Sequence, residues 1–459
     1  MIASGILLLA AWGGPSGDGE LRAGAAAEKI TPPLGIGMAG YYHKRAAEGV
    51  HDDLHAKALV LESGGTRAAI VALDLISTPR WLVEEVRREV ERDPGIPPET
   101  VLVHATHAHT GPVLPGRGPR DEILGADADP ARRYAAELPG KIARAVRRAW
   151  EARVPAAAWS ASGREDSIAF NRRYHMKDGT VGWNPGKLNP NTVRPAGPVD
   201  PELPVVLFRD AKKKPLAVSV NYAVHLDNVG GLEISADLPA TVARLLEEAL
   251  GAPLTTLYLT GCCGDVNHID VNWGEPQKGH GNAVRMGTIL AAEVLRTLPR
   301  LRAAEPGPLR ARREVVPLPL PPVTPDEVER AREVRERVRQ GKGAKFMEQV
   351  EAFKVLDVAA REGRPLEAEV QVISLGREIA WVALPGEIFV ELGLAVKHDS
   401  PFRTTQVAEL ANGSVGYVPS RRAWAQGNYE VVSARCAEGS GELLAAAVAR
   451  LLRANFTAE

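Results

Sequence analysis

The sequence is poor in cysteine and in aromatic residues, and its charges nearly cancel. Its 459 residues include three cysteines, and two of them, Cys262 and Cys263, are adjacent. An odd count with a vicinal pair argues against a disulfide framework, so we expect small buried thiols. Aromatic residues make up 5%, too few for a base-stacking platform. With 56 basic and 57 acidic residues the net charge is -1, and we expect no nucleic-acid partner.

Long apolar runs are also scarce. The run 2–12 is too short to span a bilayer, but it fits the core of a signal peptide, although no Lys or Arg precedes it. We therefore expect residues 1–20 to form a signal peptide or a disordered leader, and residues 21–459 to form the folded domain. This favours a secreted or periplasmic protein, with a cytoplasmic one as the alternative. No other stretch is apolar enough for a transmembrane segment.

The periodicity of apolar residues predicts strands and helices mixed along the whole chain. Two hairpins are expected around glycine turns, at 57–61 with 68–73 and at 370–374 with 379–383. Ser235 or Asp237 can cap a helix that runs to Leu250. The pattern predicts an α/β protein, a single large unit of mixed β-sheets flanked by α-helices. Further strands are expected at 156–162, 205–209, 217–222, 255–259 and 405–409, and helices at 81–92, 131–152 (with a kink or break at Pro139-Gly140), 282–297, 326–339, 387–398 and 442–454.

One stretch concentrates histidine at the end of an expected strand. Residues 101–112 read Val-Leu-Val-His-Ala-Thr-His-Ala-His-Thr-Gly-Pro. Side chains two apart on an extended segment face the same way, so we expect His107 and His109 to emerge together at a strand end. Imidazole is the commonest metal ligand in proteins, and the pair therefore indicates part of a metal site. The alternative is two solvated polar residues at a surface turn.

Three other segments carry groups that could complete such a site. His225 follows an expected strand, where a hydrogen-bonded structural histidine is the alternative. Glu387 comes after the turn Leu384-Pro-Gly, where it could instead serve a helix dipole. Tyr417 and Tyr429 lie in glycine-rich stretches, and packing is their alternative role. Each residue alone is weak evidence for metal binding, and only the set is informative.

The segment 260–270 combines glycines with acidic residues and histidine. Glycine beside a strand end allows close approach to a ligand. Asp265, His268 and Asp270 would make a metal cluster by composition, but loop bracing and helix capping explain such residues more often.

These motifs, in this order, resemble the neutral/alkaline non-lysosomal ceramidases, secreted zinc amidases that cleave the N-acyl bond of ceramide. The resemblance runs from Ile30-Thr-Pro-Pro-Leu-Gly to the last expected helix. It implies a ceramidase catalytic-domain fold, a Zn²⁺ cofactor, a lipid-like or small N-acyl substrate and a role in sphingolipid metabolism. The motifs that carry it are Thr-His-Ala-His-Thr-Gly-Pro at 106–112, Asn-Tyr-Ala-Val-His at 221–225, Pro-Gly-Glu at 385–387, and the spacing of Tyr417 from Tyr429.

The resemblance also implies roles for individual residues. Zinc would be held by four side chains: His107, His225, Glu387 and Tyr417. His109, Arg172 and Tyr429 would act beside the metal, and Gly40 and Tyr41 would contact the substrate. Two imidazoles, a carboxylate and a phenol suit zinc and leave a position for water.

The chain departs from the family at one catalytic position. Ceramidases carry a serine in Gly-Asp-Val-Ser-Pro-Asn, whereas this chain reads Gly-Asp-Val-Asn-His-Ile at 264–269. Asn267 therefore takes the serine's place, and an amide cannot be a nucleophile. In addition, no segment corresponds to the carboxy-terminal immunoglobulin-like domain of ceramidases. Both departures make ceramide a doubtful substrate.

We therefore expect residues 21–459 to form a ceramidase-like zinc hydrolase domain that cleaves a linear amide with a metal-activated water. Asn267 would contribute a hydrogen bond to the reaction centre. Two alternatives stay open: a zinc-stabilised protein that binds a lipid or glycan without catalysis, and a hydrolase of esters or of amides other than ceramide.

Overall fold

The largest sheet is built from strands in the first two thirds of the chain. The computed structural model describes residues 20–116, 118–251 and 253–458, so residues 1–19 of the expected leader lie outside the described residues. The strand order is β14-β12-β11-β6-β1-β3-β4-β5, with β16 paired to β6. Both ends of this order, β12 with β14 and β4 with β5, are parallel pairs, and the pairs between them are antiparallel. The bounds are β1 Arg22–Lys29, β3 His55–Ser63, β4 Thr66–Leu73, β5 Val101–Ala105, β6 Val154–Arg164, β11 Glu202–Asp210, β12 Pro215–Tyr222, β14 Thr255–Thr260 and β16 Arg302–Ala303.

A second sheet packs on the first. It contains β17 (Leu309–Leu318), β18 (Leu366–Leu375), β19 (Ile379–Ala383) and β21 (Thr404–Ala408), in that order. Alternation along β3 shows how the layers form, because Leu59 and Leu61 face the second sheet whereas Ala58 and Val60 face the helices. Phe208 of the first sheet stacks on Trp381 of the second, with ring centroids 6.3 Å apart. The core between the sheets is therefore continuous.

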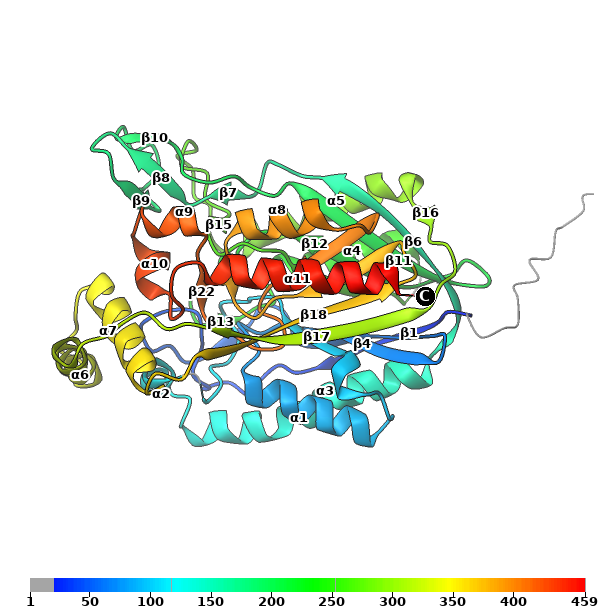
Figure 1. Cartoon of the computed structure of the whole chain (residues 1–459), viewed down its shortest axis with the longest axis horizontal. Coiled ribbons are helices and arrows are strands. Elements are labelled where there is room, and N and C mark those ends of the chain that lie inside the picture. Colours follow the sequence, from blue (N-terminus) through cyan, green and yellow to red (C-terminus); the bar gives the residue numbers. More distant parts are fainter. Residues whose placement is uncertain (1–19, 117, 252, 459) are drawn as a thin grey trace, which may run out of the picture.

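Helices cover the outer faces (Figure 1). Helices α1 (Arg80–Arg92) and α3 (Asp129–Glu151) cover one half of the large sheet, and α4 (Leu238–Leu250) and α5 (His280–Thr297) cover the other. Helices α8 (Val390–Asp399) and α11 (Ser440–Thr457) pack on the second sheet. This confirms the predicted α/β class with mixed sheets flanked by helices.

Two predicted details are wrong. Helix α3 is not broken at Pro139, because its buried side, which includes Leu138 and Ile142, packs on the sheet. That burial offsets the roughly 3 kcal/mol that an interior proline costs. The second error concerns Glu387, which does not open a helix. It lies in the two-residue strand β20 (Glu387–Ile388), and α8 begins only at Val390.

Other predicted elements are confirmed within a few residues. Both hairpins form, as β3–β4 and β18–β19, and Asp237 caps α4 by accepting a hydrogen bond from the backbone N–H of Leu238. All three cysteines are buried and free. Among the described helices, none is long and apolar enough to cross a membrane.

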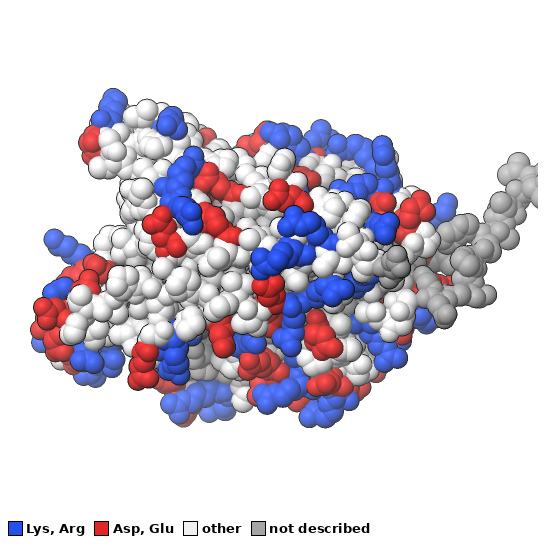
Figure 2. Space-filling view, in the orientation of Figure 1, with Lys and Arg blue, Asp and Glu red and all other residues white. Residues whose placement is uncertain are grey.

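Two arms project at one end of the molecule, on the left of Figure 1. One is a helical hairpin of α6 (Pro325–Arg339) and α7 (Phe346–Ala359), closed by a small apolar cluster. The other is the sheet of β8 (Arg173–Met176), β9 (Val181–Trp183) and β10 (Thr192–Pro195). In Figure 2 the surface recedes between the arms, and charges of both signs are interspersed over this face. The sequence predicted α6 but not α7.

Short elements complete the chain. Two-residue strands pair β2 (Gly49–Val50) with β13 (Glu233–Ile234), β7 (Phe170–Asn171) with β15 (Val266–Asn267), and β20 with β22 (Tyr417–Val418). The short helices are α2 (Pro119–Leu124), α9 (Arg421–Trp424) and α10 (Tyr429–Ser433), with 3-10 turns at Pro98–Thr100 and Leu298–Arg300.

Candidate metal centre and active site

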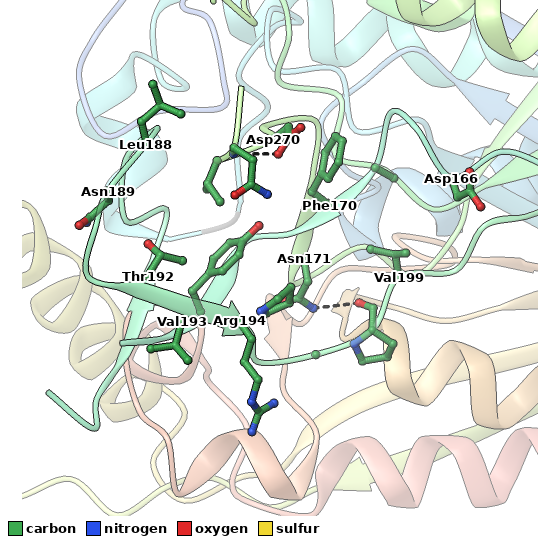
Figure 3. A pocket seen from close by; sticks show the side chains of 17 residues that line it. Asp166, Phe170, Asn171, Leu188, Asn189, Thr192, Val193, Arg194, Val199 and Asp270 are labelled. Carbon is green, nitrogen blue, oxygen red and sulfur yellow. Dashed lines mark hydrogen bonds between the residues drawn. The ribbon is translucent and has the colours of Figure 1, made fainter. Parts of the chain in front are cut away.

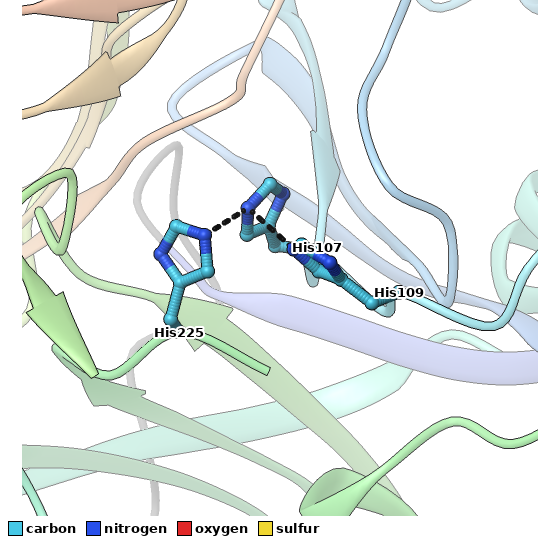
Figure 4. Close-up of side chains that lie close together, drawn as sticks. All are labelled: His107, His109 and His225. Atoms are coloured by element: carbon cyan, nitrogen blue, oxygen red, sulfur yellow. Dashed lines mark hydrogen bonds between the residues drawn. The ribbon is translucent and has the colours of Figure 1, made fainter. Parts of the chain in front are cut away.

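Three histidines that follow strands near opposite ends of the large sheet meet in one place (Figure 4). The Nε2 atom of His107 lies 2.9 Å from that of His225 and 3.2 Å from that of His109. The metal-binding atoms of all three fall within 4.8 Å of one another. His107 and His109 follow β5, and His225 follows β12, so the sheet brings together side chains 118 residues apart. The imidazoles of positions 107 and 225 are thus close enough to share an ion.

The pairing of His107 with His109 has a different cause from the predicted one. Strand β5 ends at Ala105, and His107 has a left-handed backbone with φ of 74°. The two side chains therefore converge through a turn, not through the alternation of a strand. His104, the first histidine of the run, is still in β5 and faces away; its Nδ1 meets the Glu409 carbonyl at 2.7 Å. The prediction of an extended segment was wrong, although the residues do come together.

Backbone carbonyls on the far side of the rings set their tautomers. His107 Nδ1 lies 2.8 Å from the carbonyl of Ile76, and His225 Nδ1 lies 3.3 Å from that of Cys263. If each Nδ1 carries the proton, both Nε2 atoms present lone pairs to each other. Burial lowers the pKa of His225 well below its ordinary value, which keeps the ring neutral. Two facing lone pairs repel unless a cation lies between them, so this donor set fits a divalent metal.

Glu387 and Tyr417 reach the cluster from adjacent strands. They are partners in the parallel pair β20–β22, and the Glu387 N–H donates to the Gly416 carbonyl at 2.9 Å. Glu387 Oε2 lies 3.5 Å from His107 Nε2 and 3.7 Å from His225 Nε2. Burial opposes its ionisation, but hydrogen bonds and charge from His107, with a hydrogen bond from Tyr417, lower the pKa of Glu387 to about 2. The carboxylate is therefore charged and available as a ligand.

His109 closes the cluster on the side of Gly40. Its Nδ1 is buried and has no hydrogen-bond partner among the described residues. Burial, followed by the charge of His107, lowers the pKa of His109 to about 3. Gly40 has φ of 101°, and a Cβ added there would lie 2.7 Å from the His109 carbonyl and 2.9 Å from its Nδ1. Only glycine fits this close approach.

Arg172 is held rigidly behind the tyrosines. Its Nε donates to Glu430 at 2.8 Å, and its Nη2 donates to the Gly264 carbonyl at 2.7 Å and to the Tyr417 hydroxyl at 3.1 Å. The ring of Tyr429 packs edge-on against that of Tyr417, with centroids 5.4 Å apart. Burial, followed by the negative charge of Glu387, raises the pKa of Tyr417 well above its ordinary value. Arg172 opposes that shift, and a bound cation would oppose it further.

Two predicted site residues lie farther from the centre. Tyr41 donates to Asp227 at 2.9 Å, and its ring meets His109 edge-on at 5.8 Å. Asn267 has both halves of its amide engaged in the loop: Nδ2 donates to Asn184 at 3.0 Å, and Oδ1 accepts from the Ile269 N–H at 3.0 Å. The roles assigned to these residues stay predictions.

The acidic residues of the segment 260–270 brace loops. Asp265 accepts from the Val390 N–H and from Asn171, both at 2.8 Å, and Asp270 accepts from the Asn272 N–H at 2.8 Å. This matches the loop-bracing alternative for that segment.

A small cavity of about 60 Å³ opens beside the cluster. Gly40, His107, His109, Glu387, Tyr417 and Tyr429 line it, together with Arg120 and Arg435. A larger cavity of about 510 Å³ lies between the β8–β10 arm and the loop around Asp270 (Figure 3). It contains none of the histidines of the cluster, so the smaller cavity is the candidate active site.

Sequence reasoning missed the residues that support the ligands. Glu409 is fully buried and accepts hydrogen bonds from the backbone N–H groups of Cys263 (3.1 Å) and Ile388 (2.8 Å). It thereby fixes the carbonyl that faces His225 and the strand that carries Glu387. Glu430 similarly joins Arg172 and Arg173 at 2.8 Å each. No local motif marks either residue, because the contacts span at least 21 residues.

Comparison with solved structures shows which fold class this arrangement belongs to. The fold matches the crystal structure of neutral ceramidase from Pseudomonas aeruginosa with a TM-score of 0.75 and 19% identity, over 96% of this chain and 74% of that one. A ceramidase complexed with C2 matches with a TM-score of 0.72 and 18% identity, over 96% and 75% of the two chains. The chain therefore has the neutral ceramidase fold, and the resemblance expected from its motifs is confirmed at that level.

Sequence comparisons do not extend this result. No protein-family profile matches the chain, and no curated protein matches it.

Proposed function

We propose that this protein is a zinc-dependent hydrolase that cleaves an N-acyl amide bond. The observation that carries the proposal is the convergence of His107, His225 and Glu387 with their metal-binding atoms facing one point. The ceramidase fold supports the reaction class by analogy, since a shared fold does not by itself determine function. The predicted set of His107, His225, Glu387 and Tyr417 would hold the ion, with His109 close enough to act as a further ligand.

Zinc bound there would polarise the carbonyl and lower the pKa of a water to about 7. The chain's own groups would do the rest. His109, in the cavity wall with a free Nδ1, is placed to accept the proton and to return it to the leaving amine. Arg172 and Tyr429 would stabilise negative charge on the carbonyl oxygen. Gly40, which packs directly against His109, would line the pocket beside the substrate.

Zinc content and amide hydrolysis test this proposal together. We expect purified protein to contain about one zinc per chain and to hydrolyse N-acyl amides, with Asn267→Ser changing the rate only a few-fold, because Asn267 is engaged in its loop. Turnover by the serine variant alone would contradict the proposed use of water.

The second candidate is a zinc-stabilised binding protein without catalysis, favoured by the absence of the family serine at Asn267. Zinc binding without hydrolysis of any amide or ester would support it. Hydrolysis of esters but not of amides would show that the protein cleaves an ester bond.

The proposal also covers the cellular location of the protein and the bounds of its hydrolase domain. Residues 21–459 would form the hydrolase domain, and the run 2–12 would direct the protein to the periplasm or outside the cell. Detection of mature protein that begins near residue 20 in the secreted fraction would test this.

A further inference from the structure

Arg120 differs from every other arginine around the candidate active site. It lies in helix α2 and lines the same cavity as His107, His109 and Glu387. Its side chain is 26% exposed, and its buried Nε has no hydrogen-bond partner among the described residues. The nearest carboxylate oxygen, on Asp121, is 3.7 Å from Nη2, which is beyond hydrogen-bond distance. The guanidinium therefore has donors to spare.

Neighbouring arginines show that this is not the rule in the site. Arg435 lines the same cavity and donates from Nε to Asp357 at 2.6 Å. Arg172 and Arg173 share the carboxylate of Glu430. Arg120 is held by its own packing, with its guanidinium carbon 5.2 Å from the centre of the Tyr42 ring. A guanidinium held in place with free donors is prepared to receive an anion.

The charges around the cavity permit an anion. Arg120 and Arg435 meet three carboxylates, those of Asp121, Glu387 and Asp357, and Asp357 is paired with Arg435. A divalent cation on the histidines would make the cavity positive. Its volume of about 60 Å³ has room for a carboxylate or phosphate group but not for a long acyl chain.

We infer that Arg120 binds an anionic group of the substrate, a carboxylate or a phosphate, next to the scissile bond. The substrate is then an acidic N-acyl compound and not a neutral two-chain lipid such as ceramide. That the bound anion belongs to a substrate rests on the proposed amide hydrolysis. The anion site itself is a separate property of the chain and can be measured without turnover.

Binding of simple anions tests the site directly. Glutarate and inorganic phosphate would each be titrated by calorimetry into the metal-loaded protein, which distinguishes a carboxylate from a phosphate. For the preferred anion we expect the Kd to rise about tenfold to a hundredfold in Arg120→Gln, the contribution of hydrogen bonds to a charged group. The Kd of Arg120→Lys should lie between those of wild type and Arg120→Gln, because lysine keeps the positive charge but loses the bidentate geometry of the guanidinium. Arg133→Gln, an exposed position on α3, is the matched control and should bind like wild type.

Equal binding by wild type and Arg120→Gln would overturn the inference, as would absence of binding of both anions. Because Arg120 has no hydrogen bond to another described residue, the glutamine variant should fold, and its melting temperature would verify this.

Paired amides then connect the site to catalysis. Glutaryl and pentanoyl 4-nitroanilides differ in a terminal carboxylate, and N-acetyl amino acids and their carboxamides place the same difference on the amine side. We expect wild type to prefer the acidic member of at least one pair in kcat/KM, and Arg120→Gln to reduce that preference about tenfold or more. Equal kcat/KM within both pairs would contradict the inference while leaving amide hydrolysis intact. Failure to hydrolyse any of them would contradict the proposed function, and the anion titrations would still decide the site.

Discussion

The inner part of the candidate site and its outer wall are built differently. In the inner part, carbonyls of Ile76 and Cys263 hold the rings of His107 and His225, and a strand pair holds Glu387 beside Tyr417. The outer wall is formed by side chains of short or projecting elements. Arg120 makes no hydrogen bond to a described residue, and Phe346 of α7, whose ring centroid lies 5.4 Å from that of Tyr429, is 38% exposed. Backbone contacts fix the position of a ligand more tightly than a long side chain can. The inner part is thus suited to one ion, and the wall to selecting what approaches it.

Removing an inner ligand should have the largest effect. We expect His107→Ala and His225→Ala each to lose the metal and to reduce hydrolysis about a thousandfold, because the main electrostatic contribution at the carbonyl disappears. Metal analysis of the purified variants with kcat/KM for one amide would measure both. Unchanged metal content in both variants would refute the shared site. His175→Ala, a variant of a histidine in the β8–β10 arm, is the control.

Removing an inner support should have the next largest effect. Glu409→Ala would leave the N–H groups of Cys263 and Ile388 without a partner in the core, which should cost about 3 kcal/mol of unfolding free energy. Metal affinity should fall about tenfold to a hundredfold as the loops shift. Urea unfolding and metal titration would test the two effects separately. Glu409→Gln keeps a hydrogen-bond acceptor and should lose much less unfolding free energy and metal affinity.

Gly40→Ala addresses the boundary between the two regions. The added methyl would collide with His109, so we expect kcat/KM to fall about tenfold or more with metal content maintained. Gly35→Ala is a matched control, because Gly35 also has a positive φ but nothing within 4 Å of the added Cβ. Both variants should lose about 1 kcal/mol of stability from the backbone, and only the first should lose activity. Similar activities in the two would show that His109 tolerates displacement.

The outer wall should give the smallest effect. Phe346 stacks on Trp183 with ring centroids 5.5 Å apart and an interplanar angle of 10°. Since Phe346 is partly exposed, Phe346→Ala should cost about 1 kcal/mol of stability and should raise KM more than it lowers kcat. Leu443→Ala on α11, where the side chain is 46% exposed, is the control and should leave KM unchanged. A fall in kcat comparable to that of Gly40→Ala would mean that α7 belongs to the inner part.

Local pattern was a good guide to elements and a poor guide to how they orient side chains. The glycine-centred hairpins and the cap at Asp237 follow from turn and capping chemistry within a few residues, and they were predicted. The start of α8 was predicted three residues early, because Glu387 is drawn into a strand by Tyr417, 30 positions along the chain. Helix α7 was missed, although its neighbour α6 was predicted.

The sequence by itself determined the alternation of strands and helices, the burial of three unpaired cysteines, and which histidines, acid and tyrosines could serve a metal. Those are properties of residue type and short-range spacing. Only the tertiary structure decided that His107 and His225 face each other, that Glu409 secures both neighbouring loops, and that Arg120 reaches the cavity without a hydrogen bond to any described residue. Such outcomes depend on which distant strands become neighbours, and that is set by the packing of two whole sheets rather than by any one segment.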